Sequence, residues 1–221
     1  MKLSKPTLDI LKNFSQINPS IMLKKGSFIM TKSVNSVVYA EATIEDVIDD
    51  DIGIYDINLF LNMVNLVGAD AEITYDNTTG QILIKSGHTK SSHPAADAST
   101  IIVPKKQLVL PVADLVFEIT GAQLEQLIKA ARMMKLNLVS IENIDGKLIM
   151  SAKNKEDSQS NFSLEVGEYE GDNVFNFDLS VDNMPFINND YKVLVSAKGA
   201  VKFESSLTSY VVVLESTSKF E

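Results

Sequence analysis

Histidines and carboxylates are the residues of this chain whose types could support chemistry. His88 and His93 lie five residues apart in a polar stretch that contains no cysteine and no carboxylate pair. An acidic run covers residues 46–51, but it lacks the alternating ligands, the glycine and the final glutamate of a calcium-binding loop. We interpret both histidines as exposed loop residues, and the acidic run as a solvated turn next to a strand. Incidental cation binding is the open alternative for the acidic run.

Motifs that would indicate an enzyme are absent from the sequence. The chain has no cysteine, which excludes disulfides, thiolate catalysis and cysteine zinc sites. It also lacks the patterns G-x-x-x-x-G-K-[ST], G-x-G-x-x-G and G-x-S-x-G. We therefore predict no catalytic residue, no metal and no cofactor, and an enzyme is the weaker hypothesis.

Positive charge is concentrated in two segments with helical periodicity. Residues 2–17 and 121–136 each carry a net charge of +2, whereas the whole chain carries −9, so the rest of the chain carries −13. A basic face suits sequence-independent contact with phosphates, although solvated basic helices are also common. With one arginine and no tryptophan, the chain favours neither base reading nor base stacking. The predicted basic residues are Lys2, Lys5, Lys12, Lys129, Arg132 and Lys135.

The elements that must position these helices repeat along the chain. Its 221 residues are 45% hydrophobic and 22% charged, enough for two domains with cores of their own. The pattern helix, hairpin, strand, strand, helix, hairpin, strand runs from residue 8 to 103 and restarts near residue 123. Residues 86–99 read as a loop or a weak edge strand, and residues 100–103 read as a strand. We predict an α+β architecture in which each half is an antiparallel sheet with two helices on one face.

The sequence resembles the DNA sliding clamps of T-even-type bacteriophages, which are DNA polymerase processivity factors. The resemblance covers nearly the whole chain and rests on MKLSKPTLDILKNF, INPSIMLKKGSFIMT, VVYAEATIEDVID, IGIYDINLFL, HPAADAST, GEYEGDNVFNF and YKVLVSAKG. It implies two clamp domains, at 1–104 and 115–221, joined by an interdomain connector at 105–114. It also implies a homotrimeric ring with its sheets outside and its helices inside, around duplex DNA.

The resemblance further implies partners and sites. The ring would tether the replicative polymerase, be loaded by a separate ATP-dependent clamp loader, and possibly aid late transcription of the phage. Lys5, Lys12, Lys129 and Arg132 match positions that line the hole, and Lys2 and Lys135 are additions to that set. A partner peptide would bind at Leu108, Leu110, Val112, Tyr210 and Val212, and subunits would meet through edges that carry Lys90, His93, Phe162 and Leu164.

The polar edge around His93 predicts a modest subunit contact, and titration of His93 would make ring closure pH-sensitive. Without a signal peptide or an apolar span, we expect the protein in the cytoplasm of the infected bacterial host. Two other hypotheses stay open at this point. One is an acidic two-domain adaptor or virion protein without DNA contact, and the other is an enzyme on a duplicated α+β fold.

Overall fold

The computed structural model describes residues 1–68, 70–110, 112–155 and 160–221. The chain divides into two compact units, Met1–Gln107 and Leu108–Glu221, and the division falls within the predicted connector. None of the described helices has both the length and the apolar character needed to cross a bilayer.

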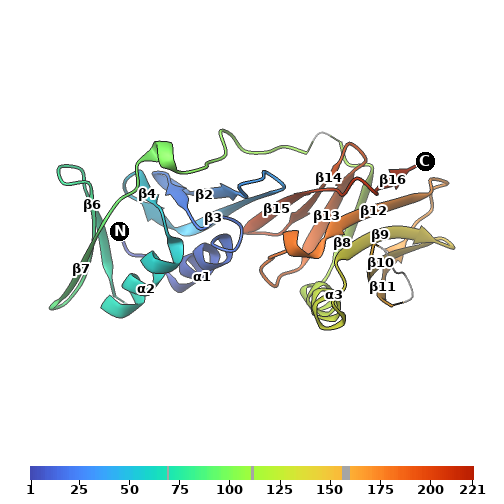
Figure 1. Ribbon diagram of the computed structural model, residues 1–221, viewed down its shortest axis with the longest axis horizontal. Helices are drawn as coiled ribbons and strands as arrows, with labels where there is room; N and C mark the ends of the chain where they lie inside the picture. Colours follow the sequence, from blue (N-terminus) through green and yellow to red (C-terminus); the bar gives the residue numbers. More distant parts are fainter. Residues whose placement is uncertain (69, 111, 156–159) are drawn as a thin grey trace. The chain divides into compact units, whose positions relative to one another are not determined.

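The first unit packs two helices against antiparallel strands (Figure 1). Strand β1 pairs with β4, β2 pairs with β3, and β5, β6 and β7 form a three-stranded sheet with β7 at its edge. In chain order the elements are α1 (Lys5–Phe14), β1 (Ile21–Leu23), β2 (Gly26–Lys32), β3 (Val38–Ile48), β4 (Ile52–Ile54), α2 (Ile57–Val67), β5 (Glu72–Asp76), β6 (Gln81–Ser86), β7 (Thr89–Pro94) and the 3-10 turn η1 (Ala98–Thr100).

Helix α1 forms where the sequence predicts it. Pro6 lies in the first turn, where its missing N–H costs no helical hydrogen bond. Ile10, Leu11 and Phe14 are buried, and the helix packs against β3. Each such side chain contributes roughly 2 kcal/mol by leaving water. The burial of this face leaves the lysines of α1 on the solvent side.

One close backbone approach requires a glycine. The N–H of Ala96 donates to the carbonyl oxygen of Gly53 over 2.8 Å. A Cβ atom added to Gly53 would overlap the carbonyl oxygen of Ala96. Gly53 therefore lets the segment after β7 pack against β4, and Ile101 is buried there.

The second unit contains two antiparallel ladders (Figure 1). One has the order β11-β10-β9-β12-β16 with β11 at its edge, and the other contains β15-β14-β13-β8. The elements are β8 (Leu115–Ile119), α3 (Gly121–Met134), β9 (Leu138–Ile144), β10 (Lys147–Lys153), β11 (Asn161–Glu168), β12 (Phe175–Ser180), the 3-10 turn η2 (Val181–Asn183), β13 (Tyr191–Ser196), β14 (Ala200–Glu204), β15 (Thr208–Val213) and β16 (Lys219–Phe220).

Helix α3 is fixed at its start by a capping box. The Thr120 hydroxyl accepts from the N–H of Gln123, and the Gln123 side chain accepts from the N–H of Thr120. Leu124, Leu127 and Ala131 are buried, and the helix packs against β10 and β11. These contacts fix which side of α3 faces solvent.

The element order confirms the internal repeat. The order α1-β1-β2-β3-β4 is matched by α3-β9-β10-β11-β12, and β5-β6-β7 is matched by β13-β14-β15. The prediction of two helices in the second half is wrong, because only the short turn η2 follows β12. Pro185 explains the difference, since an interior proline removes a helical hydrogen bond and clashes with the preceding turn.

Three details of strand prediction are also wrong. Residues 100–103 form no strand, because the Asp97 side chain caps the 3-10 turn through the N–H of Ser99 and draws Thr100 into that turn. The hairpin expected between β1 and β2 is replaced by ladders of β1 with β4 and of β2 with β3. The strand β8 lies within the second predicted domain, but no strand was expected there.

Candidate nucleic-acid interface

The first basic surface lies on α1 and the residues before it. Lys2, Lys5 and Lys12 are all exposed. Lys5 and Lys12 line a groove of about 510 Å³ between α1 and α2. None of the three has a carboxylate within ion-pair distance among the described residues. Their charge is therefore available to an anionic ligand.

The opposite wall of this groove was not predicted. Asn58, Asn62 and Asn65 on α2 all line the groove. They are four and three residues apart, which places them on one side of the helix. The Oδ1 atom of Asn58 accepts from the Ser15 hydroxyl over 3.1 Å, which leaves its amide N–H groups as donors. Amide donors add short-range polar contacts without adding charge. Asparagine at positions i, i+4 and i+7 of a helix was the signal that could have revealed this wall.

The second basic surface lies on α3. Lys129, Arg132 and Lys135 are exposed, and Lys135 ends the helix in the left-handed conformation with φ 56°. Lys129 pairs with Glu125 one turn earlier, with 2.6 Å between the ammonium and the carboxylate. An exposed pair of this kind is weak, but it reduces the field of Lys129. Arg132 and Lys135 are therefore the stronger anion-binding groups of α3.

Both basic surfaces can do the same chemistry. Exposed ammonium groups attract phosphates of any sequence and release them readily in salt. A guanidinium can read guanine through a paired hydrogen bond, but Arg132 is the only arginine of the chain. This arrangement suits weak, sequence-independent contact with a nucleic-acid backbone.

The two histidines first considered for chemistry lie on β7 and in the turn before it. His93 lies on β7 opposite Ile82 and is half-buried, while His88 is exposed in the turn before it. Over residues 1–68, 70–110, 112–155 and 160–221, the structure brings no three histidine or acidic side chains into a group that could hold a metal ion. The pH sensitivity predicted from His93 stays a prediction.

The acidic run forms ion pairs and hydrogen bonds with other segments and is therefore more than a solvated turn. Asp51 pairs with Lys24 over 2.6 Å, and Asp49 pairs with the terminal amine over 2.8 Å. Asp46 accepts from the N–H of Ser4 at 2.7 Å and from its hydroxyl at 2.9 Å. The contacts of Asp46 and Asp49 hold the residues before α1, and with them its basic face, to the end of β3.

Replacing Asp46 with Ala should lower stability by about 1 kcal/mol at neutral pH, as loss of a helix cap does. Burial opposes ionisation of Asp46, but hydrogen bonds from Ser4 and Thr7 outweigh it and lower the pKa below 3.8. The stabilisation is therefore present above pH 3.8 and lost as pH falls through the lowered pKa. Thermal melting from pH 7 to 2.5 should show the two proteins converge. The control variant Asp50→Ala should melt like the wild type. If Asp46→Ala still melts below the wild type at pH 2.5, the stabilising role of the ionised Asp46 would be contradicted.

The residues predicted to bind a partner peptide separate into two groups. Leu108 and Val112 are exposed and Leu110 is half-buried. Tyr210 and Val212 are both 0% exposed. Tyr210 packs against Phe186 and Tyr191, and burial raises its pKa to about 12. The assignment of Tyr210 and Val212 to a surface pocket is therefore corrected. Tyr210, Val211 and Val212 are all buried, so both faces of β15 are covered at this point.

The predicted subunit contacts lie on edge strands. Lys90 and His93 are on β7, and Phe162 and Leu164 are on β11. Both strands end their described ladders. Lys90 is exposed, whereas His93, Phe162 and Leu164 are half-buried. Unpaired edge strands are templates for pairing between chains.

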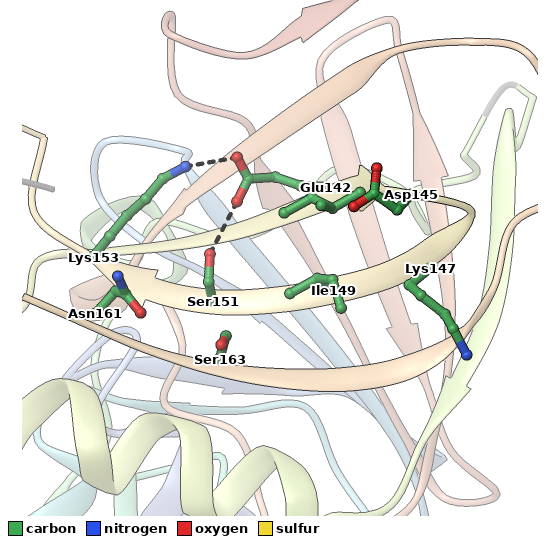
Figure 2. A pocket seen from close by; sticks show the side chains of 9 residues that line it. Glu142, Asp145, Lys147, Ile149, Ser151, Lys153, Asn161 and Ser163 are labelled. Carbon is green, nitrogen blue, oxygen red and sulfur yellow. Dashed lines mark hydrogen bonds and ion pairs between the residues drawn. The ribbon is translucent and has the colours of Figure 1, made fainter.

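A second hollow of about 440 Å³ lies on the solvent face of β9, β10 and β11 (Figure 2). Glu142 accepts from the Ser151 hydroxyl over 3.0 Å and from the Lys153 ammonium over 2.9 Å. Ile149 lies between these polar groups and Lys147 (Figure 2). Lys153 pairs with Glu142 inside the hollow, and Lys147 pairs with Glu165 and Glu168 outside it. Because both of its lysines are neutralised by carboxylates, this hollow does not resemble an anion site.

Comparison with known proteins links this geometry to one function. Residues 2–103 match the family described as DNA polymerase processivity factor, and residues 116–216 match the family described as gp45 sliding clamp, C terminal. The chain is 44% identical to the sliding clamp of Escherichia phage RB69 and 45% identical to that of Enterobacteria phage T4. Each match covers 99% of this chain and 98% of the relative. The sliding clamp of Vibrio phage KVP40 is 27% identical over 97% of this chain and 99% of the relative.

Solved structures with the same fold are more distant in sequence. A. fulgidus PCNA, bound to the C-terminal region of FEN-1, has a TM-score of 0.67 at 15% identity over 96% of each chain. The β subunit of DNA polymerase III from Pseudomonas aeruginosa has a TM-score of 0.64 at 12% identity, over 97% of this chain and 63% of that one. These similarities establish the fold.

Proposed function

We propose that this chain, which belongs to the sliding-clamp family of DNA polymerase processivity factors, closes with two further copies into a ring around duplex DNA. The observation that carries the proposal is that each unit of this duplicated chain combines a basic helix with an unpaired edge strand. Edges of this kind allow copies to join head to tail, and a rotation that closes gives a ring.

Such a ring acts without making or breaking bonds. It holds the polymerase near its template by topology, so its own contact with DNA must be weak enough to slide. Lys2, Lys5 and Lys12 on the first unit, with Arg132 and Lys135 on the second, give a surface that attracts phosphates of any sequence. The acidic remainder of the chain repels DNA from other surfaces.

We propose a clamp loader and a polymerase as further partners of this chain. We assign ring opening to a separate ATP-dependent clamp loader, since the sequence has no phosphate-binding loop of its own. The exposed apolar residues Leu108 and Val112 are our candidates for contact with a polymerase peptide. Action without catalysis, a role in late transcription and residence in the cytoplasm of the infected host belong to the same proposal.

Two measurements test this function together: the oligomeric state of the protein, and its retention on circular and on cut DNA. The protein should sediment as a trimer at micromolar concentration. After loading by the loader of the same genome, it should stay on nicked circular DNA and be lost when the circle is cut. A monomer at all concentrations would instead favour the adaptor, and retention on cut DNA would contradict the ring.

A further inference from the structure

Each basic helix carries one carboxylate inside its basic surface. Asp9 is the fifth residue of α1, and Glu125 is the fifth residue of α3. Each lies two residues before a leucine that is buried in the core, Leu11 or Leu127. The two carboxylates therefore occupy equivalent positions of the internal repeat. Both lie beyond the first helical turn, where the helix dipole stabilises an anion only weakly.

Asp9 lies among the lysines of α1. It follows Lys5 by four residues and precedes Lys12 by three, which places the three side chains on one side of the helix. All three line the groove between α1 and α2. No cation of the described residues is within ion-pair distance of Asp9. Its negative charge therefore lowers the attraction of the whole groove for an anion, instead of pairing with one lysine.

Glu125 has a fixed position next to Lys129. One carboxylate oxygen, Oε1, is 2.6 Å from the Lys129 ammonium. The other oxygen, Oε2, accepts from the side-chain amide of Asn188 over 2.9 Å. Both oxygens are therefore used, and the carboxylate is held beside the ammonium. A phosphate that approaches Lys129 must compete with this carboxylate for the same charge.

The loop after η2 supports the position of Glu125. The N–H of Gly121, at the start of α3, donates to Oδ1 of Asp190 over 2.7 Å. A Cβ atom added to Gly121 would overlap Oδ1 of Asn188, so the loop packs closely on the first turn of the helix. An exposed ion pair within one helix contributes little to stability and needs no support from a second segment. The support by this loop indicates that the position of the Glu125 charge matters for more than stability.

A protein that slides on DNA needs an attraction to phosphates that stays weak at contact. Each phosphate that a lysine neutralises releases counterions and tightens binding. A lysine that already has a carboxylate beside it gains less from a phosphate, because it must exchange one anion for another. With one carboxylate beside three cations, residues 2–17 and 121–136 each keep a net charge of +2. The attraction therefore persists while the contact itself is weakened.

We propose that Asp9 and Glu125 set how easily this protein slides, because they compete with DNA phosphates for the lysines of α1 and α3. This inference rests on the proposed ring and deepens it. It gives the two acidic residues of the basic helices a function of their own: they limit the contact that the cations create.

Removal of the two carboxylates should tighten the contact with DNA. The double variant Asp9→Asn, Glu125→Gln should bind a linear duplex at low salt about fivefold more tightly than the wild type, with a steeper salt dependence. After loading, its diffusion along DNA should be slower by about threefold or more, since each phosphate is released less readily.

A matched double variant controls for net charge. Glu170→Gln, Asp172→Asn also changes the net charge of each subunit from −9 to −7, at two exposed positions outside both helices. It should bind and slide within about twofold of the wild type, because charges away from the contact are screened by salt. If the two double variants tighten binding equally, net charge explains the effect and the inference is overturned.

A second comparison shows whether Glu125 acts through Lys129. Lys129→Gln should weaken duplex binding little in the wild type but about threefold or more in Glu125→Gln, because only there is the ammonium free for a phosphate. Melting curves report the folding of each variant. Equal losses in the two backgrounds would overturn the role of Glu125.

The same measurements separate this inference from the ring itself. If the wild type is retained on circular DNA and Asp9→Asn, Glu125→Gln binds and slides like it, the carboxylates have no such role and the ring stands. A wild type that is lost equally from circular and from cut DNA overturns both.

Discussion

Replacing Lys5, Lys12, Lys129 and Arg132 together with Glu should abolish stimulation of the polymerase on a long primed template, while the protein still folds and forms a trimer. All four side chains are exposed, so their reversal removes no core contact. Each reversal exchanges attraction to a phosphate for repulsion. The substitutions change the net charge of each subunit from −9 to −17. The measurement is the length of DNA copied per binding event.

A matched variant separates the basic helices from net charge alone. Lys25, Lys155, Lys192 and Lys198 are also exposed and lie on neither α1 nor α3. Their replacement by Glu gives the same net charge, and we expect nearly normal stimulation. If this second variant fails as completely as the first, total charge matters and the assignment of the helices is wrong.

Single reversals should not contribute equally. Lys129→Glu removes an ammonium that Glu125 already neutralises in part, and it places two carboxylates four residues apart. Lys12→Glu removes a charge that has no partner among the described residues and lines the groove. Binding of a linear duplex at low salt should therefore fall further for Lys12→Glu, with a shallower salt dependence.

The fold could be predicted wherever local signals were strong. The apolar side of α1, with Leu11 and Phe14, predicted its buried face, and the Asp145-Gly146 turn predicted the hairpin of β9 and β10, where both residues have positive φ. Pairing over long distances could not be predicted. β1 and β4 are separated in the chain by two other strands, and β4 also contacts the segment after β7 through a close approach that only Gly53 permits.

The site divides in the same way. Exposure of the lysines of α1 follows from helical spacing, because a buried stripe leaves the opposite side in solvent. Helical spacing also predicted the buried position of Phe60 on α2. The exposure of Leu59 and Leu66, at 41% and 80%, was not predicted, because these residues are as apolar as the buried ones. Val212 was assigned to a partner-peptide surface from the resemblance alone, and the apolar run Tyr210–Val213 of β15 does not reveal which neighbours cover it.

Replacing Asp178 with Ala should lower the stability of the second unit by about 3 kcal/mol and the melting temperature by roughly 10 °C. Asp178 lies on β12 and is 3% exposed. Its carboxylate accepts from the hydroxyl of Ser140 on β9, and from the hydroxyl of Thr217 over 2.6 Å. The buried charge is tolerated because hydroxyls replace its water. Alanine would leave the Ser140 hydroxyl buried without that acceptor.

The same residue joins the end of the chain to the sheet. The N–H of Glu215 donates to the carbonyl oxygen of Asp178 over 2.8 Å, and the N–H of Asp178 donates to the Ser218 hydroxyl over 2.9 Å. These bonds precede β16, where Phe220 stacks near Phe177 with ring centres 5.8 Å apart. Alanine keeps these backbone bonds but removes the hydrogen bond from Thr217 to the carboxylate, so its loss should loosen β16 before the rest of the unit unfolds.

Three variants distinguish the charge from the hydrogen bonds. Asp178→Asn keeps one acceptor for Ser140, and its amide can donate to the Thr217 hydroxyl, so it should cost less than Asp178→Ala. Asp172→Ala, at an exposed loop position, should melt like the wild type. Amide exchange of Glu221, which pairs with Val174, should accelerate in Asp178→Ala ahead of the amides of β9. Unchanged exchange at Glu221 in a destabilised Asp178→Ala would show that the carboxylate supports β9 and β12 but not the end of the chain.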